Sequence, residues 1–376
     1  AARAIVQVQP AAVLAAASEI DAVGLTELAA QVAARQPYLP LIAVDPQMAY
    51  PDNVIPFFQS PALQPQAGSD RLVARLRAAL RVRLLHATVM RRLEPATTIA
   101  LSHVDPAREA TVLLIGRGGA YPALSVALGE RTGVVGALSI EAAAKHLNVR
   151  DIDGIVLGEG FGLRVVDAFL TVLTEDPRFR NLPVIVTAND LAPAYDLPNL
   201  EIVSDDAAQV VATALPLVRQ HAFEAHLSRT LKAIDADGLI DARTGLLTRE
   251  AFERDFASAI YQTQQRGGGL SVARFAFDPE HPRAQFDGAR IISRLMRQMD
   301  FGAAQEDGSV VVVFAETDLK TAHTIARRLS SVMRHTSHGQ RDERSEPTVT
   351  VATLLPNDSA KSLRSRLQEE AHRAAS

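Results

Sequence analysis

The sequence predicts an α/β chain of three domains, two with doubly wound parallel sheets followed by an α+β domain. The chain has 376 residues, a length typical of two or three domains. In its first two-thirds, short apolar runs alternate with helical segments, a pattern typical of parallel sheets covered on both faces. The last third predicts a hairpin between strands, which favours a mixed or antiparallel sheet. We expect domains at 1–92, 111–235 and 236–376, with 93–110 as a linker.

The composition restricts the class of function. Hydrophobic residues make up 47% of the chain, enough for sizeable cores, and the net charge of -4 gives no general attraction to nucleic acid or anionic membranes. Without cysteine, disulfides and thiolate metal sites are excluded, and with no signal peptide this favours the cytoplasm. No apolar run approaches the roughly 20 residues of a membrane span. Because the chain opens within an element, we expect the first domain to be N-terminally incomplete.

The first domain shows strand-like apolar runs and two helical patterns. The expected strands are 11–16, 39–44 and 54–58, and the expected helices are 25–35 and a longer one to Arg92 that begins at a capping pair, Ser69 and Asp70. One face of the longer helix carries a row of arginines: Arg71, Arg75, Arg77, Arg81, Arg83, Arg91 and Arg92. This row is either a solvated helix face or a docking surface for an acidic partner or a sister subunit.

The second domain alternates more regularly. Expected strands are 112–115, 134–138, 154–157, 182–187 and 200–203, and expected helices are 121–131, 141–147, 163–173 and one from Ala207 to beyond Leu231. The turn Gly116-Arg117-Gly118 follows the first of these strands. It lacks the third glycine of a dinucleotide-binding motif, which favours a tight turn over a nucleotide site.

The two domains repeat one pattern, with Leu39-Pro40 matching Leu182-Pro183 before an apolar strand. Both resemble response-regulator receiver domains, which are flavodoxin-like. The resemblance implies an acidic metal pair, a phosphate-accepting Asp, a Thr or Ser and a Lys. The positions that match hold Ala16, Asp45 and Ser60 in the first copy and Gly158, Thr187 and Ser204-Asp205 in the second. We therefore expect neither domain to be phosphorylated and interpret both as dimerisation or docking modules.

The third domain opens with Asp241-Ala242-Arg243-Thr244-Gly245-Leu246-Leu247-Thr248-Arg249. This stretch is similar to the opening signature of diguanylate cyclase (GGDEF) domains, Asp-x-Leu-Thr-Gly-Leu-x-Asn-Arg. The elements expected after it are a helix 250–264, a strand 270–275, a helix ending at Asp300, a hairpin around Asp307-Gly308, a helix 319–335 and a strand 348–354.

The catalytic residues that this resemblance implies are missing. Glu306-Asp307-Gly308-Ser309-Val310 stands where the family has Gly-Gly-Asp-Glu-Phe, and Arg274 stands where a carboxylate should bind Mg²⁺. We therefore expect no enzyme activity, no catalytic residue and no metal site. Asp278, Glu280 and His281 form either a new metal cluster or a solvated loop, and the loop reading is favoured.

Arg297-Gln298-Met299-Asp300 is the strongest candidate site. An Arg and an Asp three residues apart on one helix face form either an ion pair or a binding site for a guanine edge, which accepts Arg donors at O6 and N7. In the family, an Arg-x-x-Asp motif five residues before the signature pentapeptide binds the product, and an Arg on the following helix completes the site. The resemblance therefore implies that Arg297, Asp300 and Arg328 bind cyclic di-GMP, with no other cofactor.

The order receiver, receiver, GGDEF resembles the PleD type of cyclase. A cyclase domain with a lost catalytic site and an intact product site resembles receptors of this family. That resemblance implies a homodimeric cyclic di-GMP receptor of the bacterial cell cycle, which recruits protein partners such as degradation adaptors at a cell pole. Two alternatives stay open. One is a residual cyclase with an unusual metal site around Asp278 and Asp307, and the other is a scaffold that binds no nucleotide.

Overall fold

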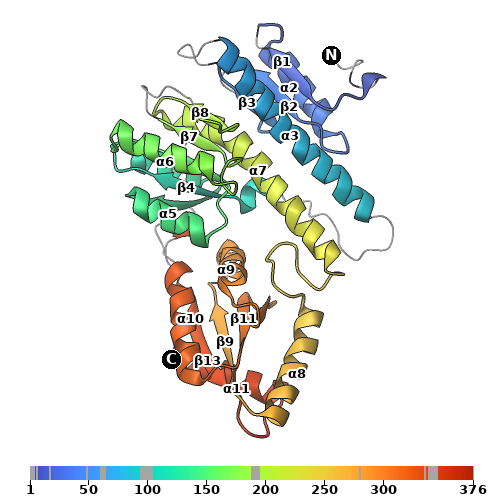
Figure 1. Cartoon of the computed structure of the whole chain (residues 1–376), viewed down its shortest axis with the longest axis vertical. Helices are drawn as coiled ribbons and strands as arrows, with labels where there is room; N and C mark the ends of the chain where they lie inside the picture. Colours follow the sequence, from blue (N-terminus) through green and yellow to red (C-terminus); the bar gives the residue numbers. More distant parts are fainter. Residues whose placement is uncertain are drawn as a thin grey trace. The chain divides into compact units, whose positions relative to one another are not determined.

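The computed structural model describes residues 5, 7–16, 18–47, 50–59, 65–93, 105–187, 195–278, 281–333, 336–337 and 346–375. The chain divides into two compact units (Figure 1). Unit 1 comprises Ala1–Ala96, Ala100–His146 and Ile152–Ser228, and unit 2 comprises Thr97–Ile99, Leu147–Asp151 and Arg229–Ser376. None of the helices in the described part is long and apolar enough to cross a membrane.

Unit 1 contains two parallel sheets. The first has the order β1-β2-β3, with β1 (Val13–Ala16), β2 (Leu41–Val44), β3 (Val54–Phe57) and the helices α2 (Ala22–Ala33) and α3 (Pro65–Leu93). Each of these strands is a short apolar run, as predicted. The prediction that Ser69 and Asp70 cap the long helix is wrong, because α3 begins at Pro65 and both residues lie inside it.

The second sheet of unit 1 has the doubly wound order. Its strands are β4 (Thr111–Ile115), β5 (Gly133–Ala137), β6 (Gly154–Leu157), β7 (Val184–Val186) and β8 (Leu200–Ile202), and they pair in parallel in the order β5-β4-β6-β7-β8. This is the flavodoxin-like order. The helices are a 3₁₀ turn η1 (Pro106–Glu109), α4 (Tyr121–Gly129), α5 (Ile140–Val149), α6 (Leu163–Glu175) and α7 (Ala207–Asp235). The predicted parallel α/β organisation is confirmed here.

Alternate strand residues separate the two faces of this second sheet. Val112 and Leu114 pack with α4 and α7 in one core cluster, which also includes Ile42 and Ala79 of the first domain. Leu113 and Ile115 are equally buried but lie outside that cluster, on the opposite face. Helices α5 and α6 run along that opposite face (Figure 1). The two sheets of unit 1 are thus joined through the face that carries α4 and α7.

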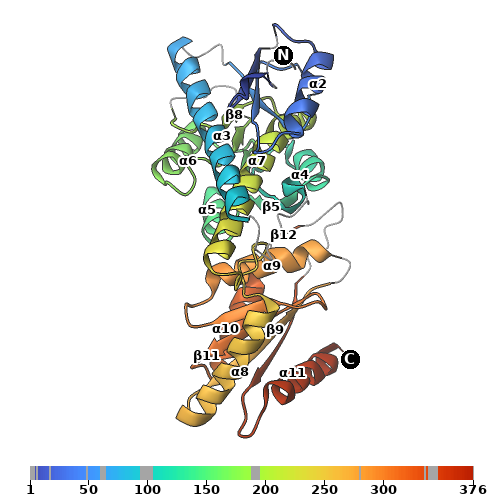
Figure 2. The same ribbon diagram turned by 90° about the vertical axis from the view of Figure 1, so that its right-hand side faces the viewer.

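Helix α3, which carries the arginine row, runs alongside α7 at this junction (Figures 1 and 2). Arg75 is fully buried, and its Nη1 lies 2.5 Å from Glu201 Oε1 and 2.6 Å from the carbonyl oxygen of Pro56. Arg81 donates from Nε to Glu224 Oε1 at 2.8 Å. For Arg75 the expectation of a solvated helix face is wrong, because this side chain is buried against residues 198–201, whereas Arg81 is exposed and pairs with α7 at the surface.

Unit 2 is built on a four-stranded antiparallel sheet of order β10-β11-β9-β13. The sequence predicted either a mixed or an antiparallel sheet here, and the sheet is antiparallel. The strands are β9 (Leu270–Ala276), β10 (Phe301–Ala304), β11 (Ser309–Ala315) and β13 (Thr348–Thr353); β12 (Thr336–Ser337) is a two-residue strand. The helices are α8 (Arg249–Arg266), α9 (Pro282–Leu295), α10 (Leu319–Met333) and α11 (Ala360–Ala375). The prediction of a helix ending at Asp300 is wrong, since α9 ends at Leu295 with extended backbone at Met296.

Each face of this sheet carries its own core. Phe275, Val312 and Phe314 pack with α9 and α10 on one face. Val272, Val313 and their neighbours pack with α8 and α11 on the other. The two-residue period of the strands therefore places one pair of helices on each side.

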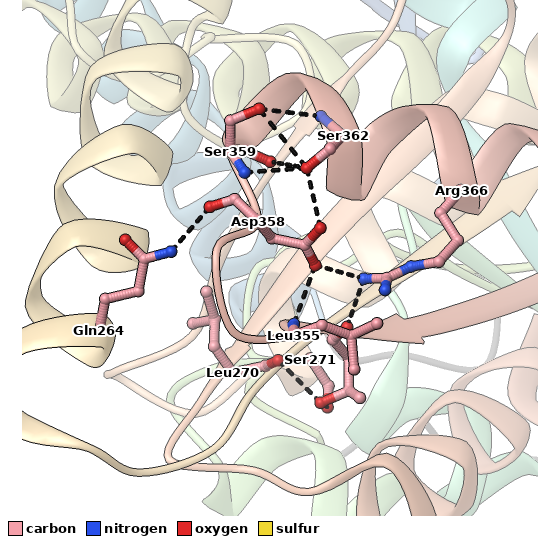
Figure 3. A network of polar contacts seen from close by, with 9 residues as sticks. Gln264, Leu270, Ser271, Leu355, Asp358, Ser359, Ser362 and Arg366 are labelled. Atoms are coloured by element: carbon pink, nitrogen blue, oxygen red, sulfur yellow. Dashed lines mark hydrogen bonds and ion pairs between the residues drawn. The ribbon is translucent and has the colours of Figure 1, made fainter.

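A polar network anchors the start of α11 (Figure 3). The Asp358 carboxylate accepts from Arg366 Nη2 at 2.6 Å, from Ser362 Oγ at 2.8 Å and from the Leu355 N–H at 2.8 Å. Its backbone carbonyl accepts from Gln264 of α8 at 2.7 Å. Burial acts to raise the pKa of Asp358, but these hydrogen bonds and Arg366 lower it overall.

Candidate functional site

The opening signature of unit 2 forms a tight turn that positions α9. Asp241 Oδ1 accepts from the Arg243 N–H at 2.8 Å, and Oδ2 accepts from Thr244 Oγ1 at 3.1 Å. Gly245 has φ +74°, and its carbonyl accepts from Ser293 Oγ of α9 at 2.9 Å. A Cβ on Gly245 would lie 2.9 Å from that same Oγ, so glycine is needed there for both conformation and space. The signature turn thus holds α9 in position, and α9 ends two residues before Arg297.

Arg297 and Asp300 lie in a turn between α9 and β10. The Asp300 N–H donates to the Arg297 carbonyl at 3.0 Å, which closes the turn. The expected shared helix face is therefore wrong, because the chain leaves the helix at Met296. The turn nevertheless keeps the two residues together. Arg297 is exposed, whereas Asp300 is only 7% exposed.

The Asp300 carboxylate is held at the end of β11. Its Oδ1 accepts from the Ala315 N–H at 3.2 Å. Burial raises the pKa of Asp300, although the backbone hydrogen bonds and the nearby charge of Arg297 oppose the shift. Among the residues that the structure describes, the Arg297 guanidinium has no hydrogen-bond or ion-pair partner, Asp300 included. The described residues thus show no direct Arg297–Asp300 ion pair, although the charge of Arg297 acts to lower the pKa of Asp300.

Arg328 lies on the exposed face of α10. Its neighbours Ala326 and Leu329 are buried in the same core cluster against which Met296, adjacent to Arg297, packs. Helix α10 also contacts α9 directly. Arg328 makes no side-chain hydrogen bond or ion pair with any described residue. Arg297 and Arg328 are thus two exposed cations, one in the turn after α9 and one on α10, and α9 and α10 pack in the same core. No described contact links Arg328 directly to Arg297 or Asp300.

An ion pair ties the hairpin between β10 and β11 to the neighbouring strand β9. Arg274 Nη2 lies 2.9 Å from Asp307 Oδ2, and Asp307 Oδ1 accepts from Ser309 Oγ at 2.6 Å. Partial burial acts to raise the pKa of Asp307, but the hydrogen bonds from Ser309 and Arg274 lower it overall. Gln285 of α9 donates to the carbonyls of Gln305 and Ser309 at 2.9 and 3.1 Å. Arg274 therefore neutralises the hairpin carboxylate within the chain.

Sequence reasoning considered Arg274 and Asp307 separately and did not identify Ser309 or Gln285 as their supports. The signal for Ser309 was present, because an Asp two residues before it typically accepts its backbone N–H in an Asx-turn, here at 3.0 Å. No comparable local signal exists for Gln285, which lies 20 residues from Gln305 in sequence.

The proposed metal cluster is incomplete in the described part of unit 2. His281 Nδ1 lies 3.2 Å from Asp278 Oδ2, and Glu280 lies outside the described residues. Over the whole described part of the chain, no three His, Asp or Glu side chains are grouped to hold a metal ion.

The receiver-like positions lie at the carboxyl ends of their strands. Ala16 ends β1 and Gly158 follows β6, while Thr187 is buried after β7. Asp45 follows β2 with φ +50°, and Ser60 lies outside the described residues.

The Gly116-Arg117-Gly118 segment is a tight turn, as the sequence favoured. The Arg117 N–H donates to the Glu159 carbonyl at 3.1 Å, and the Tyr121 N–H donates to that of Gly118 at 3.2 Å. A Cβ on Gly118 would lie 2.6 Å from the Glu159 side chain. The turn is thus packed closely against the end of β6.

The sequence matches no protein-family model and none of the curated proteins. Part of the chain is similar to solved GGDEF domains. One is the GGDEF domain of DgcB from Caulobacter crescentus in complex with c-di-GMP, at 16% identity and TM-score 0.32, covering 36% of this chain and 90% of that one. Another is the FimX GGDEF domain from Pseudomonas aeruginosa, at 17% identity and TM-score 0.33, covering 36% and 93%. A sensory box/GGDEF family protein from Caulobacter crescentus matches at 21% identity and TM-score 0.32, covering 36% and 97%. These likenesses assign no activity to the chain.

Proposed function

We propose that the chain is a non-catalytic receptor of cyclic di-GMP that binds the dinucleotide through Arg297, Asp300 and Arg328. One observation carries the proposal. The Arg297 guanidinium is exposed and has no partner among the described residues, yet it stands in the same turn as a largely buried carboxylate. This turn offers donors for the O6 and N7 of guanine and an acceptor for its N–H groups.

Arg328 supplies a second cation for the same ligand. It is exposed on α10, a helix that packs against α9, and it too has no described partner. A phosphate or a second guanine edge is the natural ligand for such a guanidinium. Part of the binding energy is then electrostatic, so affinity should fall as the salt concentration rises.

The hairpin supports the absence of cyclase activity in this proposal. Catalysis of GTP condensation needs a carboxylate that is free to hold a divalent cation, whereas Asp307 is paired with Arg274 and hydrogen-bonded to Ser309. A bound metal would have to displace the guanidinium and compete with its charge. This arrangement favours a receptor over a residual cyclase.

The biological role follows from the resemblance. The combination of a lost catalytic site and a retained ligand site resembles the PopA type of receiver, receiver, GGDEF protein. We therefore extend the proposal to recruitment of protein partners, such as degradation adaptors, by a homodimer at a cell pole in the cytoplasm, in bacterial cell-cycle signalling. The receiver-like domains serve in this view as docking modules that are not phosphorylated.

Isothermal titration of the full chain with cyclic di-GMP tests the receptor. We expect saturable binding that Arg297→Ala and Arg328→Ala each weaken, while Arg327→Ala, which removes an exposed arginine next to Arg328, leaves it unchanged. No binding by the unmodified chain would support the nucleotide-independent scaffold. Incubation with GTP and Mg²⁺ or Mn²⁺ tests the cyclase, and cyclic product that is lost in Asp307→Ala would overturn the proposal.

A further inference from the structure

Helix α6 presents an apolar row to solvent. Val165, Ala168 and Val172 are exposed, with Val165 at 45% and Val172 at 58%. Their spacing of three and four residues places them on one side of the helix. The buried side consists of Val166, Phe169, Leu170 and Leu173. The apolar surface of α6 thus extends beyond the side that contacts its own domain onto an exposed flank of the helix.

Two charged residues flank this row at opposite ends. Arg164 lies in the first turn of α6 and Glu175 is its last residue, and both are exposed. They are eleven residues apart, about three helical turns, so they lie on the same side of the helix. Neither has an ion-pair or hydrogen-bond partner among the described residues.

These two charges do not stabilise their own helix. The helix macrodipole favours anions at the N-terminus and cations at the C-terminus, and α6 has neither: its first turn contains no acid and its last turn no base. Arg164 and Glu175 have the reverse arrangement. An intermolecular partner that pairs with both would account for their placement.

We propose that this row is a dimer interface, and that its occupant is α6 of a second copy of the chain. A two-fold axis midway between Ala168 and Phe169 sets two α6 helices antiparallel, with Val165 of each copy facing Val172 of the other. Arg164 of each copy then lies only about 3 Å along the helix axis from the level of Glu175 of the other, an offset that two long side chains can span. The small side chain of Ala168 at the crossing point permits close approach of the two helices.

Among the described residues of unit 1, the packing between the two sheets lies away from this row. Helices α4 and α7 and the first domain all pack on the opposite face of the second sheet. The α3 arginines are used there within one chain. Dimerisation through α6 therefore competes with none of these contacts of the described residues, and it does not depend on the proposed nucleotide site.

Sedimentation velocity of the full chain over a concentration series tests the proposal without ligand. Because one helix pair buries less than the roughly 1,600 Å² of a standard interface, we expect a monomer–dimer equilibrium that shifts with dilution. Arg164→Glu converts two attractive contacts into repulsive ones and should weaken the dimer by roughly tenfold or more. Glu175→Arg should do the same, and the double variant Arg164→Glu/Glu175→Arg should restore the dimer.

Lys145→Glu, an exposed reversal on α5, is the matched control and should leave the dimer unchanged. The cysteine-free chain allows a second test, because Ala168→Cys places one thiol near the two-fold axis. It should form an intermolecular disulfide on oxidation, whereas Lys145→Cys should not. A chain that stays monomeric at every concentration, a dimer insensitive to Arg164→Glu, or a double variant that does not recover would each overturn the proposal.

Discussion

Two arginine sites in this chain show opposite arrangements. At the junction of the two sheets in unit 1, Arg75 is fully buried and is satisfied by Glu201 and by carbonyl oxygens of Pro56 and Pro198. At the turn after α9, Arg297 is exposed and has no partner among the described residues. Burial lowers the pKa of Arg75 and raises the pKa of Glu201, although their mutual attraction opposes both shifts.

The difference separates folding from binding. A guanidinium whose donors are all used inside the chain contributes to the fold and has little left for a ligand. A guanidinium held near a carboxylate but left unpaired contributes little to stability and retains its donors. Arg274, paired with Asp307 at the partly exposed hairpin, lies between these extremes. Substitutions at the three positions should therefore have different consequences.

The largest effect is expected at Arg75. Arg75→Ala leaves the buried Glu201 with only its longer ion pair to Arg71, at 3.8 Å, so the free energy of unfolding should fall by up to about 3–5 kcal/mol. Chemical denaturation followed by circular dichroism measures this loss. Arg77→Ala, which removes an exposed arginine of the same helix, is the control and should change stability by less than about 0.5 kcal/mol. Equal effects of the two substitutions would contradict the assignment of Arg75.

The second effect is on ligand affinity at Arg297. A hydrogen bond to a charged group contributes about 1.5–3 kcal/mol, so Arg297→Ala should weaken cyclic di-GMP binding by roughly 10- to 100-fold. Its thermal stability should stay that of the unmodified chain, since the side chain has no described partner to lose. A parallel loss of stability and affinity would show that Arg297 is structural.

The third effect concerns the hairpin pair. Because Arg274 and Asp307 are partly exposed, Arg274→Ala should cost at most about 1 kcal/mol of stability. It should also raise the pKa of Asp307, because one of the hydrogen bonds that lower that pKa is removed. A carboxyl-selective NMR titration measures the shift. An unchanged pKa would mean that Ser309 alone sets the ionisation of Asp307.

The smallest effect is the pH dependence that Asp300 gives to binding. Its raised pKa means that the folded state holds the proton more tightly than the unfolded state, so the contribution of Asp300 to folding is favourable in acid and is lost as pH rises through the folded pKa. Guanine N–H donors favour the ionised carboxylate. Affinity should therefore fall as pH decreases through the folded pKa, and the decline should be absent in Asp300→Asn.

Local sequence patterns predicted much of the fold. The apolar runs of β4 and β6 and the helical pattern of α6 have the expected type and nearly the expected bounds, because each buries one continuous apolar face. The hairpin at Asp307-Gly308 was also predicted, and Gly308 has φ +79°. One error lies at the start of α3. Ser69 and Asp70 have capping side chains, but α3 continues in front of them.

The sequence predicted which residues form the candidate site, but it did not predict the backbone conformation that holds them. The spacing of Arg297 and Asp300 fits a helix, and only the structure shows that Met296 ends it. The Arg75–Glu201 pair joins residues 126 positions apart, and no local pattern specifies such a contact. The same holds for Arg274 and Asp307, which meet because β9 and the hairpin are neighbours in the sheet.

The most direct test of the receptor is a calorimetric titration of cyclic di-GMP into the full chain and into its Arg297→Ala and Arg327→Ala variants at one salt concentration. The account predicts saturable binding to the full chain, an unchanged affinity in Arg327→Ala and a large loss in Arg297→Ala. Absence of binding to the full chain, or the same affinity in Arg297→Ala, would contradict it.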